Sequence, residues 1–311
     1  MVKCSRCKKP AFTKLARHNA SFCEECFELF FSRQVNEAIK KYRMFHKTEP
    51  VLLGVSGGKD SMSLWHYLHR SGYQVVGIHF DLGIGEYSYL SRKIAEDFAQ
   101  SYALPLQIIA LSETIGYSIP QIAQRIRHRS PCSLCGSIKR YLLNQFAFSN
   151  HFTVYATGHN LDDETATLLG NVLHWQTDYL AHQNPSLPSP HPKMPRKVKP
   201  FYSLTEEEIS LYARIKEIPF ITEPCPLSKK AKSLNYKEAL NLLEKYSPGT
   251  KHNFFFGFLE KASQLFSSHG EVVLKGCEIC GMPTTQKTCS FCKIMQKVHE
   301  RKDDHVHSRT E

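Results

Sequence analysis

Short apolar runs alternate with amphipathic stretches through the middle of the chain. The run VLLGV at 51–55 is uniformly apolar, as in a strand that is buried on both faces, and a helix is predicted after it at 60–70. Further strands are predicted at 74–80, 106–111, 153–157 and 219–222. Further helices are predicted at 87–102, 135–148, 162–174 and 205–217. This alternation predicts an α/β fold, in which helices cover both faces of a parallel sheet.

Three segments lie outside this alternation. Apolar residues recur at helical spacing over 27–42, which predicts a helix that links the start of the chain to the sheet. Residues 236–267 are predicted to be helical, with a break at 248–249. Residues 180–200 contain six prolines and four basic residues, and we expect a mobile loop or spacer there. The basic end of this segment could contact RNA, although an ordinary solvated loop explains it equally well.

The composition narrows the class of protein. Of the 311 residues, 41% are hydrophobic, which is enough for a buried core and excludes disorder as the main state. Because the chain has neither a run of about 20 apolar residues nor a signal peptide, we expect a soluble, cytoplasmic protein. Forty Lys and Arg against 29 Asp and Glu give a net charge of +11. This charge favours a polyanionic partner such as RNA, or it serves solubility alone.

Eleven cysteines form five C-x2-C pairs and one single cysteine. Two pairs lie near each end of the chain, and this spacing is typical of zinc sites with four thiolates. The predicted ligands are Cys4, Cys7, Cys23 and Cys26 for the first zinc, and Cys277, Cys280, Cys289 and Cys292 for the second. These zinc sites stabilise their domains, and their basic neighbours suit contact with RNA.

The most informative motif is SGGKDS at 56–61, between the first predicted strand and the helix after it. Glycines let the backbone approach phosphate oxygens, and the N-terminus of the following helix supplies partial positive charge. Ser56 and Ser61 add hydroxyl donors and Lys59 adds a cation, while Asp60 could cap the helix or help to hold Mg²⁺. The motif therefore predicts a phosphate-binding loop, which differs from the loop of the kinase-like NTPases.

The central cysteines form a second candidate site. Cys132 and Cys135 lie among basic residues, which favour the thiolate, and Cys225 follows the last predicted strand. Three cysteines without a fourth ligand suit an iron–sulfur cluster with one open iron. A redox-active dithiol with a persulfide carrier and a buried structural Cys225 are the alternatives. The carboxylates at 162–164 could cap a helix or hold Mg²⁺.

In this order, the motifs resemble the PP-loop ATP pyrophosphatases and, among them, the TtuA/Ncs6 group of the TtcA/TtuA superfamily of tRNA 2-thiolation enzymes. The resemblance implies a HUP-like sheet of about five parallel strands, flanked by N- and C-terminal zinc fingers. It implies a 4Fe–4S cluster on Cys132, Cys135 and Cys225. It also implies the catalytic residues Asp60, Lys139 and Asp163. The implied ATP-binding residues are Gly54, Val55, Ser56, Gly57, Gly58, Lys59, Asp60, Ser61, Ile78, His79, Phe80 and Gly158.

We divide the chain into six parts on this basis. They are a zinc finger at 1–27, a linker helix at 28–48, a PP-loop catalytic domain at 49–246, a helical segment at 247–275, a second zinc finger at 276–296 and a disordered tail at 297–311.

The resemblance implies ATP-dependent thiolation of tRNA. ATP with Mg²⁺ would adenylate O2 of a uridine, and sulfur from the C-terminal thiocarboxylate of a ubiquitin-like protein would replace that oxygen by way of the cluster. Uridine 54 in the T loop is the expected target, and wobble uridine 34 is the alternative. A homodimer is implied by analogy. The rival hypothesis is a non-catalytic RNA-binding protein with zinc knuckles, and the intact SGGKDS motif with Asp163 argues against it.

Overall fold

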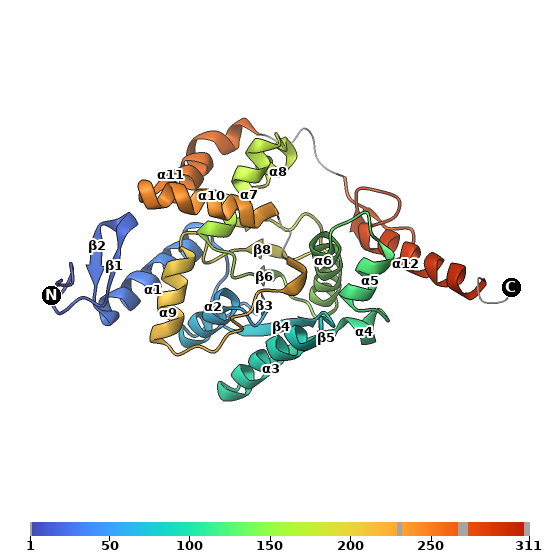
Figure 1. The fold of residues 1–311 in the computed structure, drawn as a ribbon, viewed down its shortest axis with the longest axis horizontal. Coiled ribbons are helices and arrows are strands. Elements are labelled where there is room, and N and C mark those ends of the chain that lie inside the picture. Colours follow the sequence, from blue (N-terminus) through green and yellow to red (C-terminus); the bar gives the residue numbers. More distant parts are fainter. Residues whose placement is uncertain (1, 229–231, 267–272, 308–311) are drawn as a thin grey trace.

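A twisted sheet with helices on both faces forms the centre of the computed structural model (Figure 1). The structure describes residues 2–228, 232–266 and 273–307, and within them the largest sheet has six strands in the order β5-β4-β3-β6-β8-β7. Its strands are β3 (Val51–Gly54), β4 (Val75–Asp81), β5 (Leu106–Ala110), β6 (Val154–Ala156), β7 (Ser186–Leu187) and β8 (Arg196–Val198). Only β7 runs antiparallel to its neighbour, so the predicted α/β class with a parallel sheet is confirmed.

The helices follow the predicted pattern, with three short additions and the unpredicted helix α12. They are α1 (Glu24–Lys41), α2 (Lys59–Arg70), α3 (Gly85–Ser101), α4 (Leu111–Thr114), α5 (Ile119–Arg125), α6 (Pro131–Ser149), α7 (Leu161–Leu173), α8 (Thr177–Ala181), α9 (Glu206–Ile215), α10 (Lys232–Tyr246), α11 (Thr250–Gly257) and α12 (Ser290–His307). The sequence pattern predicts neither α4, α5 nor α8, because helices this short span too few turns to show a period.

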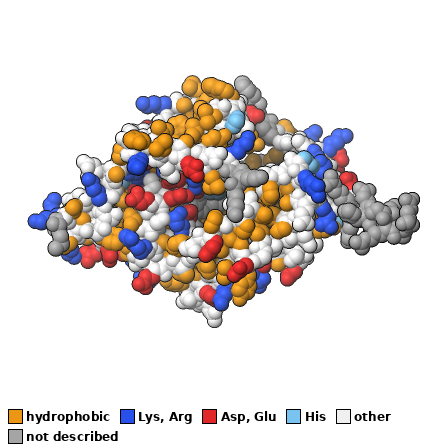
Figure 2. Space-filling view, in the orientation of Figure 1, with side chains coloured by type: hydrophobic (Ala, Val, Ile, Leu, Met, Phe, Trp, Pro, Cys, Tyr) orange, Lys and Arg blue, Asp and Glu red, His pale blue; other side chains and the backbone are white. Residues whose placement is uncertain are grey.

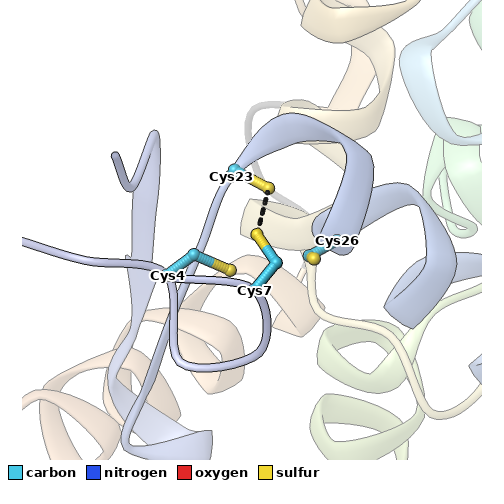
Figure 3. Close-up of side chains that lie close together, drawn as sticks. All are labelled: Cys4, Cys7, Cys23 and Cys26. Carbon is cyan, nitrogen blue, oxygen red and sulfur yellow. Dashed lines mark hydrogen bonds between the residues drawn. The ribbon is translucent and has the colours of Figure 1, made fainter. Parts of the chain in front are cut away.

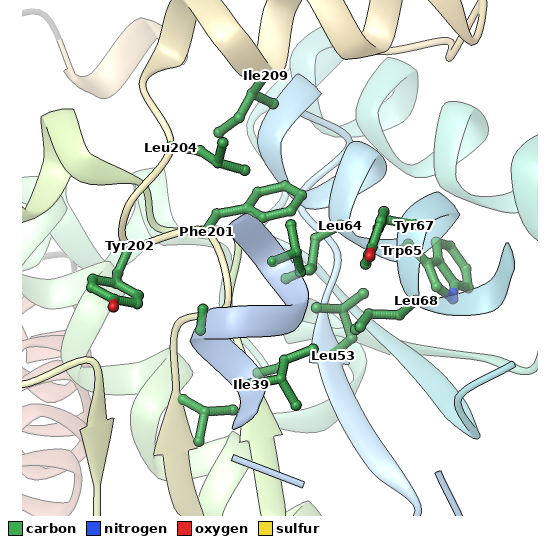
Figure 4. Packing of buried hydrophobic residues seen from close by; sticks show 14 of the residues in the cluster. Ile39, Leu53, Leu64, Trp65, Tyr67, Leu68, Phe201, Tyr202, Leu204 and Ile209 are labelled. Carbon is green, nitrogen blue, oxygen red and sulfur yellow. The ribbon is translucent and has the colours of Figure 1, made fainter. Parts of the chain in front are cut away.

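Both faces of the sheet are packed, which explains why its central strands are uniformly apolar. Leu53 contributes to the main core (Figure 4). In the same core, Phe31 of α1 stacks on Tyr212 of α9 with their ring centroids 4.0 Å apart. The neighbouring Leu52 points to the other face and packs with Leu143 of α6. Because helices cover both faces, the loops after β3 and β6 are accessible only at the carboxyl edge of the sheet.

The fifth parallel strand is not the predicted one. Residues 219–222 form no strand, and β8 pairs with β6 instead, so the prediction of a loop or spacer over 180–200 is wrong where β7 and β8 lie. The sequence obscures β8 because prolines surround its three residues and only Val198 of them is fully buried. The segment 219–222 contacts the phosphate loop, where the N–H of Ile221 donates to the carbonyl of Gly57 over 2.9 Å.

The N-terminal knuckle (residues 2–23), with its hairpin β1 (Thr13–Leu15) and β2 (Ala20–Phe22), is anchored to the body by a buried ion pair. Arg17 donates to both carboxylate oxygens of Glu208, over 2.9 and 2.7 Å, and to the carbonyl of Ser203. Such a bidentate pair fixes orientation as well as distance. The first helix, α1, begins directly at this knuckle, with Cys23 as its N-cap.

The C-terminal knuckle (residues 275–292), with β9 (Lys275–Gly276) and β10 (Pro283–Thr284), packs against α6. Tyr141 of α6 stacks on Phe291 with ring centroids 3.8 Å apart, and Val298 of α12 is buried in the same cluster as α5 and α6. Helix α12 continues to His307, within the tail predicted to be disordered, and residues 308–311 lie outside the described part of the chain. Among the helices described, none is long and apolar enough to cross a membrane.

Candidate active site

The phosphate loop and the segment around Asp163 meet at the carboxyl edge of the sheet. The loop follows β3 and the second segment follows β6, which are adjacent parallel strands. The chain passes from β3 to β4 on one side and β6 lies on the other, so this is the point where the strand order reverses. Open α/β sheets bind ligands at such a point.

The phosphate loop is held open by hydrogen bonds among its own residues. The Ser61 hydroxyl accepts from the Ser56 backbone N–H over 3.1 Å and donates to the carbonyl of Gly58 over 3.0 Å. Gly57 has a φ of +77°, and a Cβ there would lie 2.7 Å from the Ser91 carbonyl oxygen, so the position requires glycine. Helix α2 begins at Lys59, and its N-terminal N–H groups are available to an anion.

Gly158 lets the second segment approach the loop. A Cβ at this position would lie 2.8 Å from the backbone of Asp60 and of Ser61, so a larger residue would push the two segments apart. Asp163, five residues further on, forms a capping box with Asn160 at the start of α7. The two carboxylates predicted to be catalytic, Asp60 and Asp163, therefore lie in neighbouring helix N-termini, close enough for each charge to affect the other.

Two lysines and a third carboxylate complete this cluster of charges. Lys59 pairs with Asp60 over 2.8 Å, and Lys237 of α10 pairs with Asp163 over 2.6 Å and also with Glu206. Burial raises the pKa of Asp60, and Lys59 only partly opposes it. Burial would also raise the pKa of Asp163, but His159 and Lys237 outweigh it and lower that pKa. Nothing in the sequence pattern singled out Glu206 or Lys237, which lie far along the chain from the two motifs.

Strand β4, which contains the implied ATP-binding residues Ile78, His79 and Phe80, is largely enclosed. Ile78 and His79 are buried within β4, and Nδ1 of His79 lies 2.9 Å from the carbonyl of Val55, to which it donates. Burial lowers the pKa of His79 and so favours its neutral form. Phe80, at the end of the strand, is only partly buried. The carboxyl end of β4 thus lies beside the phosphate loop with Phe80 as its accessible side chain.

The central cysteines lie where α6 and the segment after α9 meet. Cys132 is exposed in the first turn of α6, and its Sγ lies 3.6 Å from the carbonyl of Leu227, two residues after Cys225. Burial raises the pKa of the Cys135 thiol, and Lys139 opposes that effect, so the expectation of a ready thiolate does not hold for Cys135 in this structure. Lys139 nevertheless faces Cys135 closely enough to influence its charge.

The eight terminal cysteines form two compact groups of four. Figure 3 shows the N-terminal group. All sulfur atoms within a group lie within 4.8 Å of one another, with Cys7 and Cys23 3.5 Å apart. Four thiolates about 2.3 Å from one tetrahedral ion would lie about 3.8 Å apart, so both groups have the donors and the spacing of a single zinc site. In the described chain the three central cysteines do not meet this criterion, and ligands of different irons in one cluster are spaced more widely than ligands of one ion.

A cavity of substantial size lies elsewhere. It measures about 1350 Å³ and is lined by the end of α1 and by residues that lead into β3 and β4, at the opposite edge of the sheet from the phosphate loop. Its lysines include Lys40 and Lys41 in the last turn of α1, where cations complement the helix dipole. We therefore do not count this cavity as part of the active site.

Comparison with known proteins agrees with this geometry. Residues 28–232 match the family model of the PP-loop domain, and residues 3–28 match that of the N-terminal LIM domain of 2-thiouridine synthetase TtuA. The chain is 44% identical to a tRNA-5-methyluridine(54) 2-sulfurtransferase of Thermus thermophilus, over 96% of this chain and 92% of that protein. It is 42% identical to the protein of the same name from Thermotoga maritima, over 97% and 99% of the two chains.

A solved structure extends the comparison to three dimensions. The U34-tRNA thiolase NcsA from Methanococcus maripaludis, solved with its 4Fe–4S cluster, superimposes with a TM-score of 0.82 at 27% identity. The alignment covers 95% of this chain and 96% of that one. The chain therefore belongs to the PP-loop family and, within it, to the family of the tRNA-5-methyluridine(54) 2-sulfurtransferases.

Proposed function

We propose that this protein is an ATP-dependent tRNA 2-sulfurtransferase that replaces O2 of uridine 54 by sulfur. The observation that carries the proposal is the meeting of the phosphate loop with Asp163 across Gly158, within a chain that matches the named sulfurtransferases along nearly its whole length. Identity to the relatives named for uridine 54 is 41–44%, against 27% to the structure named for uridine 34, and this difference supports the choice of base.

The phosphate loop and the two carboxylates suit the activation half-reaction. O2 of the uridine attacks the α-phosphorus of ATP, and pyrophosphate leaves. The loop N–H groups, the α2 N-terminus and Lys59 would bind the phosphates, and Asp60 with Asp163 would hold Mg²⁺, since hard cations prefer carboxylate oxygens. Fixed donors of this kind stabilise the charge on the leaving pyrophosphate without reorganisation. The remaining predicted nucleotide contacts, including Phe80 and Gly158, are part of the same proposal.

The three central cysteines suit the sulfur-transfer half-reaction. Cys132, Cys135 and Cys225 offer three sulfur donors from two segments that touch at Leu227, and they would hold a 4Fe–4S cluster with one iron free of protein ligands. When bound, the cluster supplies an iron that can accept an additional sulfur. Lys139 would stabilise the negative charge that develops as AMP departs with the uridine oxygen, since it lies one turn from Cys135. The product is 2-thiouridine.

The terminal cysteine groups would each hold one structural Zn²⁺, because their four sulfurs leave no open ligand position. We further propose a small protein with a C-terminal thiocarboxylate as the sulfur donor and the cytoplasm as the compartment. The compartment is supported by eleven free cysteines, which a reducing environment preserves.

We propose that the protein acts as a homodimer. Apolar side chains gather over α8, α10 and α11 at the top of Figure 2. Exposed apolar residues on or next to these helices are Trp175, Tyr179, Leu242, Leu243, Tyr246 and Leu265. A surface of this kind is typical of a contact between proteins, and a second copy of the chain would cover it.

The test is thiolation by the purified protein under anaerobic conditions, with a tRNA transcript, Mg²⁺-ATP and sulfide as the sulfur source. We expect 2-thiouridine by nucleoside mass spectrometry, and none when uridine 54 alone is replaced by cytidine. A transcript changed only at position 34 is the matched control. If product is lost only with the transcript changed at position 34, the target is uridine 34, the base named for NcsA.

The variant Asp60→Asn distinguishes the proposed enzyme from the rival hypothesis of a non-catalytic RNA-binding protein. The variant is expected to bind tRNA normally and to release at least about 100-fold less pyrophosphate, because one carboxylate of the magnesium site is lost. If the parent protein binds tRNA but releases no more pyrophosphate than Asp60→Asn does, the chain is a non-catalytic RNA-binding protein and the proposed activity is wrong.

A further inference from the structure

Lys237 of α10 bridges the N-termini of α7 and α9. Its Nζ lies 2.6 Å from Oδ1 of Asp163 and also contacts Oε1 of Glu206. The side chain is 19% exposed, so this is not a freely moving surface lysine. Burial alone would lower the pKa of Lys237, but the two carboxylates outweigh it and raise that pKa. Lys237 is therefore a fixed cation in the nucleotide-free protein.

The packing of α10 on α7 holds Lys237 in this position. Tyr236, the preceding residue, lies against Gly170, where a Cβ would come within 2.8 Å of the tyrosine ring. Its hydroxyl lies 3.0 Å from Nε2 of His174, and Leu240 of the same helix is buried. These contacts fix the helix, and the helix directs Lys237 to the N-terminus of α7.

Lys237 contacts the carboxylate oxygen of Asp163 that is not used in the capping box. Asp163 has two carboxylate oxygens, and Oδ2 accepts the backbone N–H of Asn160 in the capping box over 3.2 Å. The other oxygen, Oδ1, is the one that Lys237 holds. A divalent ion bound to Oδ1 would lie beside the Lys237 ammonium, and the repulsion between the two cations favours displacement of the lysine.

The net charge of the cluster determines whether a divalent ion can replace Lys237 on Asp163. Asp60, Asp163 and Glu206 carry three negative charges and Lys59 and Lys237 carry two positive charges, so the cluster has a formal charge of −1. Such a site attracts a divalent cation only weakly. ATP brings several negative charges to the loop, which would let a divalent ion replace the lysine on Asp163.

We propose that Lys237 is the resident counter-ion of the magnesium site: it holds Asp163 and Glu206 while the nucleotide is absent, and it gives up Oδ1 of Asp163 when Mg²⁺-ATP binds. The inference rests on the proposed function in that it takes Asp163 as a magnesium ligand. Its consequence is that the metal enters together with the nucleotide, because the free protein keeps its carboxylates paired.

Mn²⁺ binding to nucleotide-free protein tests the proposal, with electron paramagnetic resonance of free Mn²⁺ as the readout. Lys237→Met keeps the length of the side chain and removes its charge, and we expect Mn²⁺ affinity to rise at least about tenfold. Lys237→Arg should bind Mn²⁺ like the parent. Lys216→Met is the matched control, because it also breaks a lysine–carboxylate pair but lies at the end of α9, with Glu28 as its partner. Unchanged or weaker Mn²⁺ binding by a folded Lys237→Met protein would refute the proposal.

A second measurement does not depend on whether that variant folds. In ¹⁵N-lysine-labelled parent protein, an ion-paired Lys237 ammonium should give a correlation signal that is missing from Lys237→Arg. We expect this signal to move when Mg²⁺ and a non-hydrolysable ATP analogue are added together, and to stay when Mg²⁺ is added alone. The proposal is wrong if the Lys237 signal does not move when Mg²⁺ and the ATP analogue are bound. Neither measurement uses tRNA or sulfur, so a protein that passes both and fails to thiolate would contradict only the proposed function.

Discussion

Lys139 shares a face of α6 with Cys135 and lies one helical turn after it. Its charge opposes the effect of burial on the Cys135 thiol, so the two side chains are close. We predict that Lys139→Ala retains the cluster and binds tRNA normally but thiolates about 10²–10³-fold more slowly, the loss expected when one fixed electrostatic group is removed. Cluster absorbance, tRNA affinity and 2-thiouridine formation are to be measured on one preparation.

Lys216→Ala serves as the control for this variant, because it removes a lysine from α9 without affecting the cysteines. Normal thiolation by Lys139→Ala would show that Lys139 is an ordinary solvated charge. Loss of iron together with activity would instead make it a structural residue.

Among single residues, the sequence could identify those that stand in a motif. Asp60 stands in the phosphate-loop motif, and Asp163 is one of three carboxylates at the start of a helix, from which the family resemblance selects it. The structure brings the two residues together. Glu206 and Lys237 could not be found in this way, because their role depends on how α9 and α10 pack against α7. Without knowledge of that packing, both residues look like ordinary helix-surface charges.

At the scale of elements, α2 and α9 are joined by a hydrogen bond that depends on pH. Nδ1 of His66 lies 2.9 Å from the Tyr212 hydroxyl, and burial lowers the pKa of His66 to about 4. The unfolded chain binds this proton below pH 6.5, whereas the folded protein binds it only near pH 4. The stability contributed by neutral His66 is thus complete above pH 6.5 and is lost as the pH falls towards 4.

We predict that Asn or Gln at position 66 weakens this acid sensitivity. Between pH 7 and 5, the parent protein should lose about 2 kcal/mol more of its free energy of unfolding than His66→Gln does. Urea unfolding at the two pH values measures the difference, and His46→Gln, at an exposed histidine, is the control. Equal losses in parent and His66→Gln would mean that His66 does not contribute to acid sensitivity.

We predict that the iron site can be removed without loss of either zinc site. Replacing Cys132, Cys135 or Cys225 by Ala should abolish the iron content and leave two zinc ions per chain, because the knuckles fold on their own ligands. Replacing Cys4 should lower the zinc content and the melting temperature. Metal analysis of anaerobically prepared protein measures both effects, and iron that persists in all three central variants would exclude the proposed cluster ligands.

The hydrophobic pattern predicted the elements whose burial is continuous, and it failed where a strand is short. β3 and β4 lie inside the sheet and are largely apolar, with His79 and Asp81 as the polar residues of β4. By contrast, β8 has only three residues and pairs with β6. The pattern at 219–222 is apolar for another reason, since this segment covers the phosphate loop. A local pattern reports burial, and here it could not tell which neighbour buries the segment.

At the scale of the whole molecule, the apolar surface over α8 and α10 predicts self-association. Trp175→Asp should shift the protein from dimer to monomer in sedimentation experiments, because a charge would be buried at the contact. Tyr89→Asp is the control, since Tyr89 is similarly exposed but lies on α3. A parent protein that sediments as a monomer at micromolar concentration would exclude the homodimer.

The stack of Tyr141 on Phe291 would make the proposed iron site depend on the proposed zinc site. Phe291 lies between two ligands of the C-terminal knuckle, and Tyr141 lies on the helix that begins with Cys132 and Cys135. A knuckle without zinc would release the far side of that helix, although no iron ligand had been touched. A cell that runs short of zinc would then make an enzyme that cannot keep its iron. Its transfer RNA would then lack the sulfur of 2-thiouridine. A shortage of zinc in the cell would thus reduce an RNA modification that contains no zinc.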